Sequence, residues 1–374
     1  MRPFIYSIIF LFTINTIFSQ TEELVLRKGF DIDQNTILNL DVDNATIQFV
    51  ESTEDKIHIA YSVLFEKNSE EVVFKVFKDL YANATKSNNV VNLEVKNSMY
   101  LGELHALDVN IETYTKHIGE YIKNIKKNEF LYKSKNALLK EIKNSSGLGW
   151  HDYFNRLKRD NPNKNFGKSN KRFKQNFIIK APKYVMLQIK ALRSKINFNY
   201  DLLKPIELNS FNTYLKFKGL TNPKNKFSLH SGIFQSEKVV GGTFFFKDVI
   251  KVRIGSISEA KLKTETSKIQ IGEVNRNVEF KDFNSKLHFY NFDTNFVKLD
   301  FVGDYSELNF YNIKDENYAM HVFGFNTALN LNNVKTTFPL KKDEKLTKIL
   351  EKKAKNNSQN RVDIELKNGI LNIR

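Results

Sequence analysis

The feature that most constrains the fold of this chain is a phrase that occurs three times at intervals of 21 residues. It reads SKLHFYNF at 285–292, SELNFYNI at 306–313 and TALNLNNV at 327–334, with polar and apolar residues in matching positions. Such regular spacing indicates one structural unit that is used repeatedly. A unit this short cannot bury an apolar face alone, so successive units must stack on one another.

The pattern extends beyond these three phrases. A Ser or Thr is followed two residues later by Ile or Leu and four residues later by another apolar residue, beginning at Ser194. The spacings of the leading apolar residues are 18 to 21, apart from one gap of 35 that has room for two units. Those residues are Ile196, Leu215, Ile250, Ile269, Leu287, Leu308 and Leu329. The preceding residues match too, since Val278 and Phe280 correspond to Leu299 and Phe301, so each unit contains two short strands.

We therefore predict an all-β fold of the β-solenoid type, built from stacked coils of about 20 residues. Equivalent residues of adjacent coils would lie about 4.8 Å apart, the ordinary spacing between strands. Two interior ladders are expected, one of Leu287, Leu308 and Leu329 and the other of Phe289, Phe310 and Leu331. An antiparallel sandwich is the alternative, because it also places strands at short intervals, but it gives no reason for the 21-residue match.

Two segments near the C-terminus depart from the repeat. Residues 343–355 are predicted to form a short helix. The closing sequence RVDIELKNGILNIR at 361–374 predicts two strands around an Asn-Gly turn, arranged either as a hairpin or as a terminal coil.

The middle of the chain has a different character. From about Ile111 the apolar residues recur at helical spacing, as at Tyr114, Ile118, Ile122 and Ile125. The net charge of the chain is +16, and residues 121–180 hold 16 lysines and arginines against 4 acidic residues. We predict a helical, basic insertion at 111–175, between an N-terminal β segment at 21–110 and the main repeats with a C-terminal cap at 176–374. A solvated helical face is its simplest interpretation, and contact with anionic envelope material is the alternative.

The first 20 residues have the three parts of a secretory signal peptide. Arg2 supplies the positive charge, an apolar stretch follows, and the small residue Ser19 stands near the expected cleavage site. The chain contains no cysteine, which excludes disulfides, thiolate metal sites and a lipoprotein anchor. We expect an exported protein of the periplasm or the extracellular space, without a lipid anchor and without a transmembrane segment in the mature chain.

The chain resembles the toastrack-type adhesin domains, a family of bacterial envelope β-solenoids whose molecular function is largely unassigned. The resemblance rests on DNATIQFVESTEDKIHIAYS at 43–62, IKAPKYVMLQIKALRSKINF at 179–198, the SELNF-type strands and LKNGILNI at 366–373. It covers about residues 24–110 and 176–374 and implies a non-enzymatic adhesion or scaffolding role. The chain departs from the family where Asn, Asp or Tyr replaces the usual turn glycine, and the insertion has no counterpart there.

The sequence offers no recognisable catalytic motif. Seven histidines are present, but none lies in a zinc-binding spacing, and there is no nucleophile elbow, phosphate loop or dinucleotide fingerprint. Asp300 and Asp304 flank an expected turn, where solvated carboxylates are the simpler interpretation. We expect no enzymatic activity and no cofactor or metal. The alternative is a carbohydrate-active enzyme or a polysaccharide-binding protein on a β-helical frame.

Outward positions of the repeat are the remaining candidates for binding. His288, Tyr290, Asn309, Tyr311 and Asn330 would line one face, where rings and amides suit a sugar or a partner surface, although such ladders also stabilise stacked strands. The basic candidates of the insertion are Lys123, Lys126, Lys127, Arg156, Lys158, Arg159, Lys171 and Arg172. The expected partners are an anionic envelope polysaccharide, a lipid surface or another envelope protein, and nucleic acid is not expected because of export.

Overall fold

The computed structural model describes residues 21–65, 80–97, 173–311, 318–331, 347–352, 354 and 359–374. All the regular structure in these residues is β-strand, and the strands form one 25-stranded sheet, so the all-β prediction is confirmed. The predicted signal peptide at 1–20 lies outside the described residues. So does the predicted helical insertion up to residue 172, and strand β7 begins at Phe173, inside the last residues of the predicted range.

The strands range from 2 residues in β10 to 15 in β11 and β12. They are β1 (Thr21–Asp31), β2 (Ile37–Asp43), β3 (Thr46–Glu51), β4 (Lys56–Phe65), β5 (Ala82–Ser87), β6 (Val90–Lys96), β7 (Phe173–Ala181), β8 (Met186–Leu192), β9 (Lys195–Phe198), β10 (Asp201–Leu202), β11 (Ile206–Leu220), β12 (Lys226–Val240), β13 (Thr243–Lys247), β14 (Lys251–Ser258), β15 (Ala260–Glu265), β16 (Lys268–Val274), β17 (Asn277–Phe283), β18 (Lys286–Phe292), β19 (Lys298–Asp304), β20 (Glu307–Phe310), β21 (Ala319–Phe325), β22 (Ala328–Leu331), β23 (Thr347–Lys352), β24 (Arg361–Lys367) and β25 (Ile370–Ile373).

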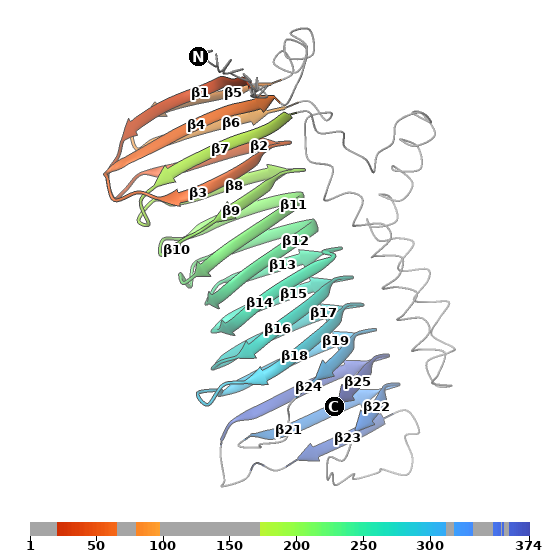
Figure 1. The fold of residues 1–374 in the computed structure, drawn as a ribbon. Coiled ribbons are helices and arrows are strands. Elements are labelled where there is room, and N and C mark those ends of the chain that lie inside the picture. The colour runs from red at the N-terminus through yellow and green to blue at the C-terminus, as the bar shows by residue number, and fades with distance from the viewer. Residues whose placement is uncertain are drawn as a thin grey trace, which may run out of the picture.

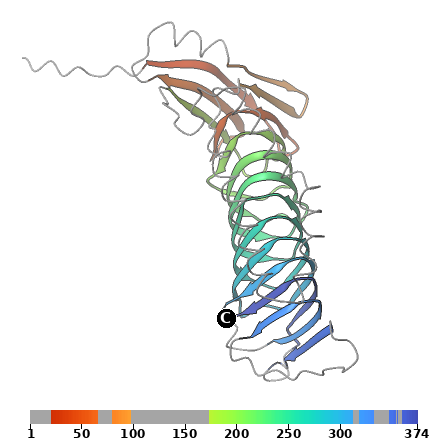
Figure 2. The same ribbon diagram turned by 90° about the vertical axis from the view of Figure 1, so that its right-hand side faces the viewer.

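The pairings arrange these strands in two ladders, which run side by side along an elongated stack (Figures 1 and 2). The short β10 stands outside the two orders below and pairs with the end of β11. Ladder A has the order β5-β6-β2-β8-β11-β12-β13-β15-β17-β19-β24-β21-β23. Ladder B has the order β1-β4-β7-β3-β9-β11-β12-β14-β16-β18-β20-β25-β22. Strands β11 and β12 bend through a corner and belong to both ladders. The pairing is parallel except at the ends of the stack, where β1, β4, β5 and β23 pair antiparallel.

The core lies between the two ladders, because every second residue of each strand points inward. Aromatic rings stack from coil to coil there, as Phe49 does on Phe198 at 4.3 Å and Phe289 on Phe310 at 4.9 Å between centroids. Leu287, Phe289, Leu308 and Phe310 are fully buried, as the repeat predicts. Leu329 and Leu331, near the end of the stack, are partly buried against the same core.

The order of the coils differs from the order of the sequence at the C-terminal end. Strands β24 and β25 lie between the coil of β19 and β20 and the coil of β21 and β22. Leu371 therefore separates Leu308 from Leu329, and Ile373 separates Phe310 from Leu331, so the direct stacking predicted for both pairs is wrong. The closing segment has apolar residues in the same positions as the repeat, so it fits between two coils that resemble it. Because β24 and β25 enter different ladders, the segment is a coil and not a hairpin.

The N-terminal end shows the same kind of intercalation. The coil of β2 and β3 lies between β8 and β9 on one side and β6 and β7 on the other. Strands far apart in the sequence thus lie side by side at both ends of the stack (Figure 1).

Two local predictions are wrong. The helix expected at 343–355 is absent where the chain is described, because Thr347–Lys352 forms β23 and pairs with β21 along the end of the stack. The leading residue of the coil near Asp248 is Val252 and not Ile250, since Val252 is the residue that pairs with Ile269. The corner before Val252 holds one residue more than the corner before Ile269. The gap of 35 residues does contain an extra coil, because Leu215 pairs with Phe234 and Phe234 pairs with Val252.

Each corner from ladder A to ladder B contains a residue with positive φ that is not glycine. They are Asn44, Arg193, Asn212, Ser231, Asp248, Thr266, Asn284, Tyr305, Asn326 and Asn368. Asn and Asp tolerate this conformation better than other residues with side chains, which explains their frequency at the turn. These ten positions thus adopt a glycine-like backbone with residues other than glycine.

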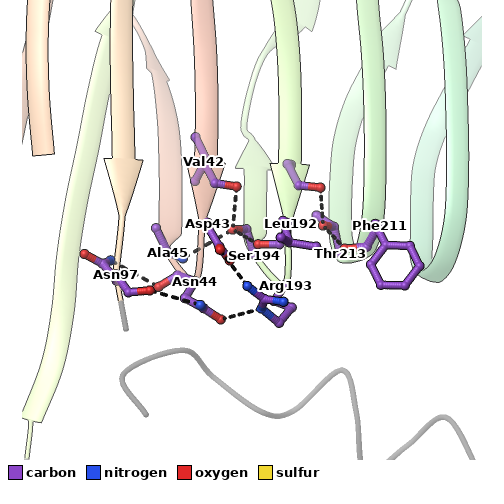
Figure 3. A network of polar contacts seen from close by, with 11 residues as sticks. Val42, Asp43, Asn44, Ala45, Asn97, Leu192, Arg193, Ser194, Phe211 and Thr213 are labelled. Carbon is purple, nitrogen blue, oxygen red and sulfur yellow. Dashed lines mark hydrogen bonds and ion pairs between the residues drawn. The ribbon is translucent and has the colours of Figure 1, made fainter. Parts of the chain in front are cut away.

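The Ser or Thr that opens each phrase follows the positive-φ residue and closes the corner. Its hydroxyl donates to the carbonyl two residues earlier, as Ser194 does to Leu192 at 2.7 Å and Thr327 to Phe325 at 3.0 Å. Ser194 also accepts a hydrogen bond from the backbone N–H of Ala45 in the next coil (Figure 3). The hydroxyl is conserved in the repeat because it satisfies buried backbone groups between coils.

Candidate functional site

The predicted outward residues come together on ladder B, where β18, β20, β25 and β22 lie side by side. His288 is in register with Asn309, Asn309 with Asn372, and Asn372 with Asn330. We name His288, Tyr290, Tyr311 and Arg374 the ring strip, and Asn309, Asn372 and Asn330 the amide ladder.

The ring strip is a set of nearly parallel side chains. The rings of Tyr290 and Tyr311 stack with centroids 4.9 Å apart and planes 13° apart. His288 lies parallel to both rings, and its Nδ1 is 3.1 Å from the hydroxyl of Tyr311. The guanidinium of Arg374 lies 5.6 Å from the centroid of Tyr311, within the range of a cation–π contact. The three rings are half-buried, so one part of the strip faces solvent.

The amide ladder runs beside the ring strip. Asn372 donates to Asn309 Oδ1 at 3.0 Å, and Asn330 donates to Asn372 Oδ1 at 2.7 Å. Asn309 is fully buried, and its Nδ2 also donates to Glu307 Oε1 at 3.1 Å. Asn309 therefore supports the coils and does not offer its amide to a ligand, whereas Asn330 is exposed.

The electrostatics of the strip favour neutral rings. Burial, together with the charge of nearby Lys286, lowers the pKa of His288 to about 4, so the imidazole is neutral at pH 7. Burial also raises the pKa of Tyr311 above its ordinary value. Below the strip, Lys286 and the buried Glu307 form an ion pair at 2.9 Å.

Two members of this site escape the sequence-based prediction. Asn372 and Arg374 belong to the closing segment, which lies outside the predicted repeat. The signal was present, because ILNI at 370–373 has the same pattern as ALNL at 328–331. Gly369 in place of Ser or Thr hides the match.

The basic residues predicted for binding cannot be placed. Lys123, Lys126, Lys127, Arg156, Lys158, Arg159, Lys171 and Arg172 lie outside the described residues. In the part of the chain that the structure does describe, no three His, Asp or Glu side chains are grouped as a metal site. Nor does that part contain a helix of sufficient length and apolar character to cross a bilayer.

Comparisons with known proteins add little to this geometry. No protein-family model matches the chain, and no curated protein matches its sequence. One similar solved structure is described as a "putative cell adhesion protein" from Clostridium sporogenes. It has 10% sequence identity and a TM-score of 0.19, with 95% of the present chain and 99% of the other covered. A score that low carries no argument about function, so the resemblance to toastrack-type adhesin domains stays a prediction.

Proposed function

We propose that this protein is an exported, non-enzymatic β-solenoid of the bacterial envelope that acts as an adhesion or scaffolding module. The repeat of the sequence and the two ladders of parallel strands support the solenoid form. The signal-like N-terminus and the absence of cysteine support export.

The observation that carries the binding role is the ring strip. Stacking on each other and on the coils beneath them holds its tyrosines in a fixed orientation. Binding a ligand would therefore cost little side-chain entropy. Aromatic faces with polar edges are favourable contacts for sugar rings and for partner side chains. Arg374 adds a charged donor at the end of the strip.

The test is a binding assay with residues 21–374 on a glycan array, followed by pull-down of envelope proteins. We expect the Tyr290→Ala/Tyr311→Ala variant to lose at least tenfold in affinity for the neutral glycan or envelope protein that the chain retains, because both stacking faces are removed. Tyr214→Ala is the matched control, since Tyr214 is a partly exposed tyrosine on β11, outside the strip. If the chain retains no polysaccharide, lipid or envelope protein, the proposal is wrong.

A carbohydrate-active enzyme is the second candidate, and one row of side chains on ladder A favours it. Asp300, Asp363, His321 and Glu351 are in register on four adjacent strands, and paired carboxylates are what glycoside cleavage requires. Lys298 contacts both aspartates, at 2.7 and 3.8 Å, so the row also has a structural explanation as ion pairing.

The two candidate functions differ in what happens to a bound polysaccharide. An enzyme would release reducing ends from a bound polysaccharide, and Asp300→Asn/Asp363→Asn would abolish that release. A binding module would retain the polysaccharide without shortening it, whether or not these aspartates are replaced.

A further inference from the structure

A hollow lies at the other end of the stack, on the outer face of β1, β4 and β7. It has a volume of about 820 Å³, within the usual range for ligand sites. The hollow exists because small residues occupy outward positions where neighbouring strands carry long side chains. Gly29 faces His58, Ala60 lies between Arg27 and Ile178, and Ser62 is in register with Leu24.

The charged side chains that line this groove differ in whether they have a partner within the described chain. Both carboxylates have partners, since Glu54 contacts His58 at 3.1 Å and Glu22 accepts a hydrogen bond from Ser62 at 2.5 Å. Among the cations, Lys28 donates to the carbonyl of Ala84 at 2.6 Å. Arg27 and Lys180 are exposed, and neither has an ion pair or a side-chain hydrogen bond within the described chain. Two unsatisfied cations therefore face the groove, which favours an anionic ligand.

The remaining lining combines hydrogen-bonding and apolar groups. Ser62 and Asn176 lie in one row across β4 and β7, and Ala60 and Ile178 lie in the row beside it. Leu24 is 54% exposed at the edge. A ligand with hydroxyls, apolar faces and separated negative charges matches this surface, and a lipid bilayer does not, because a bilayer needs a broad apolar patch.

We propose that this groove binds an acidic oligosaccharide whose carboxylates contact Arg27 and Lys180. The guanidinium can hold a carboxylate through two parallel hydrogen bonds, and the lysine supplies a point charge. The two residues stand on β1 and β7, two strand spacings and two residues apart, so their backbones are roughly 12 Å apart. A chain that carries one carboxylate on each sugar can reach both cations at once. The groove is separate from the ring strip, so either site can fail without the other.

The probe is tetragalacturonate, a chain of four carboxylated sugars, titrated calorimetrically into residues 21–374. We expect binding that weakens as salt rises from 50 to 500 mM, and no binding of maltotetraose, which is neutral. Arg27→Gln/Lys180→Gln should lower the affinity at least tenfold. Lys216→Gln/Lys218→Gln removes the same charge from exposed positions of β11 and should leave the affinity unchanged.

A filling variant tests the groove independently of charge. A Cβ at Gly29 would lie 3.5 Å from Nδ1 of His58, an ordinary contact, so Gly29→Leu should fold and block the hollow. We expect it to abolish tetragalacturonate binding while its thermal unfolding stays close to that of the parent. Tyr290→Ala/Tyr311→Ala should still bind tetragalacturonate, which separates this site from the proposed function.

Four results would overturn the proposal. They are no binding of tetragalacturonate, equal binding of maltotetraose, undiminished binding by Arg27→Gln/Lys180→Gln, or binding only to phosphatidylglycerol vesicles. The last result would assign these cations to a lipid surface.

Discussion

At the scale of the residue, Asp282 is a buried carboxylic acid surrounded by hydrogen-bond donors. Its carboxylate is buried at the corner between β17 and β18 and accepts hydrogen bonds from Thr264, from the Ser285 N–H at 3.0 Å and from Ser306 at 2.5 Å. Burial outweighs these donors and raises its pKa from 3.8 to about 6. The folded protein thus holds a proton that the unfolded chain would release.

This shift predicts a pH dependence of stability. A raised pKa in the folded state contributes stability that is complete below about pH 4 and is lost as the pH rises to about 6. Asp282→Asn cannot ionise, so its free energy of unfolding relative to wild type should improve over that interval by at most about 3 kcal/mol. Urea unfolding of both proteins at several pH values checks this, and parallel stability profiles would contradict it.

The positive φ of the corners gives a second prediction. Asn284 has a φ of 56° and its side chain is buried. Asn284→Ala and Asn284→Gly both remove the amide, but only glycine adopts this conformation freely. We expect the alanine variant to be less stable than the glycine variant by about 1 kcal/mol, as measured by thermal unfolding. Equal stability would show that the corner is not strained.

Residue-level prediction from the sequence succeeded for the interior and failed for part of the surface. The alternation of inward and outward residues along each strand predicts which leucines and phenylalanines are buried, because each inward side chain contacts the equivalent residue of the next coil. Alternation also predicts that Asn309 points outward, and it cannot show that Asn309 is nevertheless fully buried. Burial of an outward residue depends on what covers it, and that is a tertiary property.

At the scale of the element, the position of β24 and β25 changes which leucine is interior. Leu371 has a coil on either side and is fully buried, whereas Leu329 stands in the last coil of ladder B and is partly buried. Leu371→Ala should therefore destabilise the fold by about 2–4 kcal/mol and Leu329→Ala by about 1 kcal/mol. Chemical unfolding of the two variants compares them, and the reverse order of stabilities would support stacking in sequence order.

The sequence could not predict this arrangement because the coils are nearly interchangeable. Val362 and Ile364 offer ladder A the same apolar slots as Met320 and Val322, and Leu371 offers ladder B the slot of Leu329. Periodicity reveals which segments can stack, but the order depends on small differences in packing between similar interfaces. The helix predicted at 343–355 is wrong for a related reason. The edge of the sheet at β21 can pair with another strand, and this tertiary pairing overrides the local helical pattern at β23.

At the scale of the whole molecule, the central claim is that the C-terminal coil lies inside the stack. The same insertion brings Asn372 and Arg374 to the amide ladder and the ring strip, so the candidate site depends on it. The repeat architecture and the two-ladder core follow from the sequence, whereas this site requires the coil order as well.

Cysteine pairs test the coil order directly, because the chain has no cysteine of its own. Val302, Glu365 and Phe323 are exposed on β19, β24 and β21, with Glu365 in register with both other residues. Adjacent strands lie about 4.8 Å apart, and a disulfide cannot join residues whose Cα atoms are more than about 7 Å apart. We predict that Val302→Cys/Glu365→Cys forms a disulfide under mild oxidation and that Val302→Cys/Phe323→Cys does not. A disulfide in the second pair and none in the first would contradict the intercalated coil.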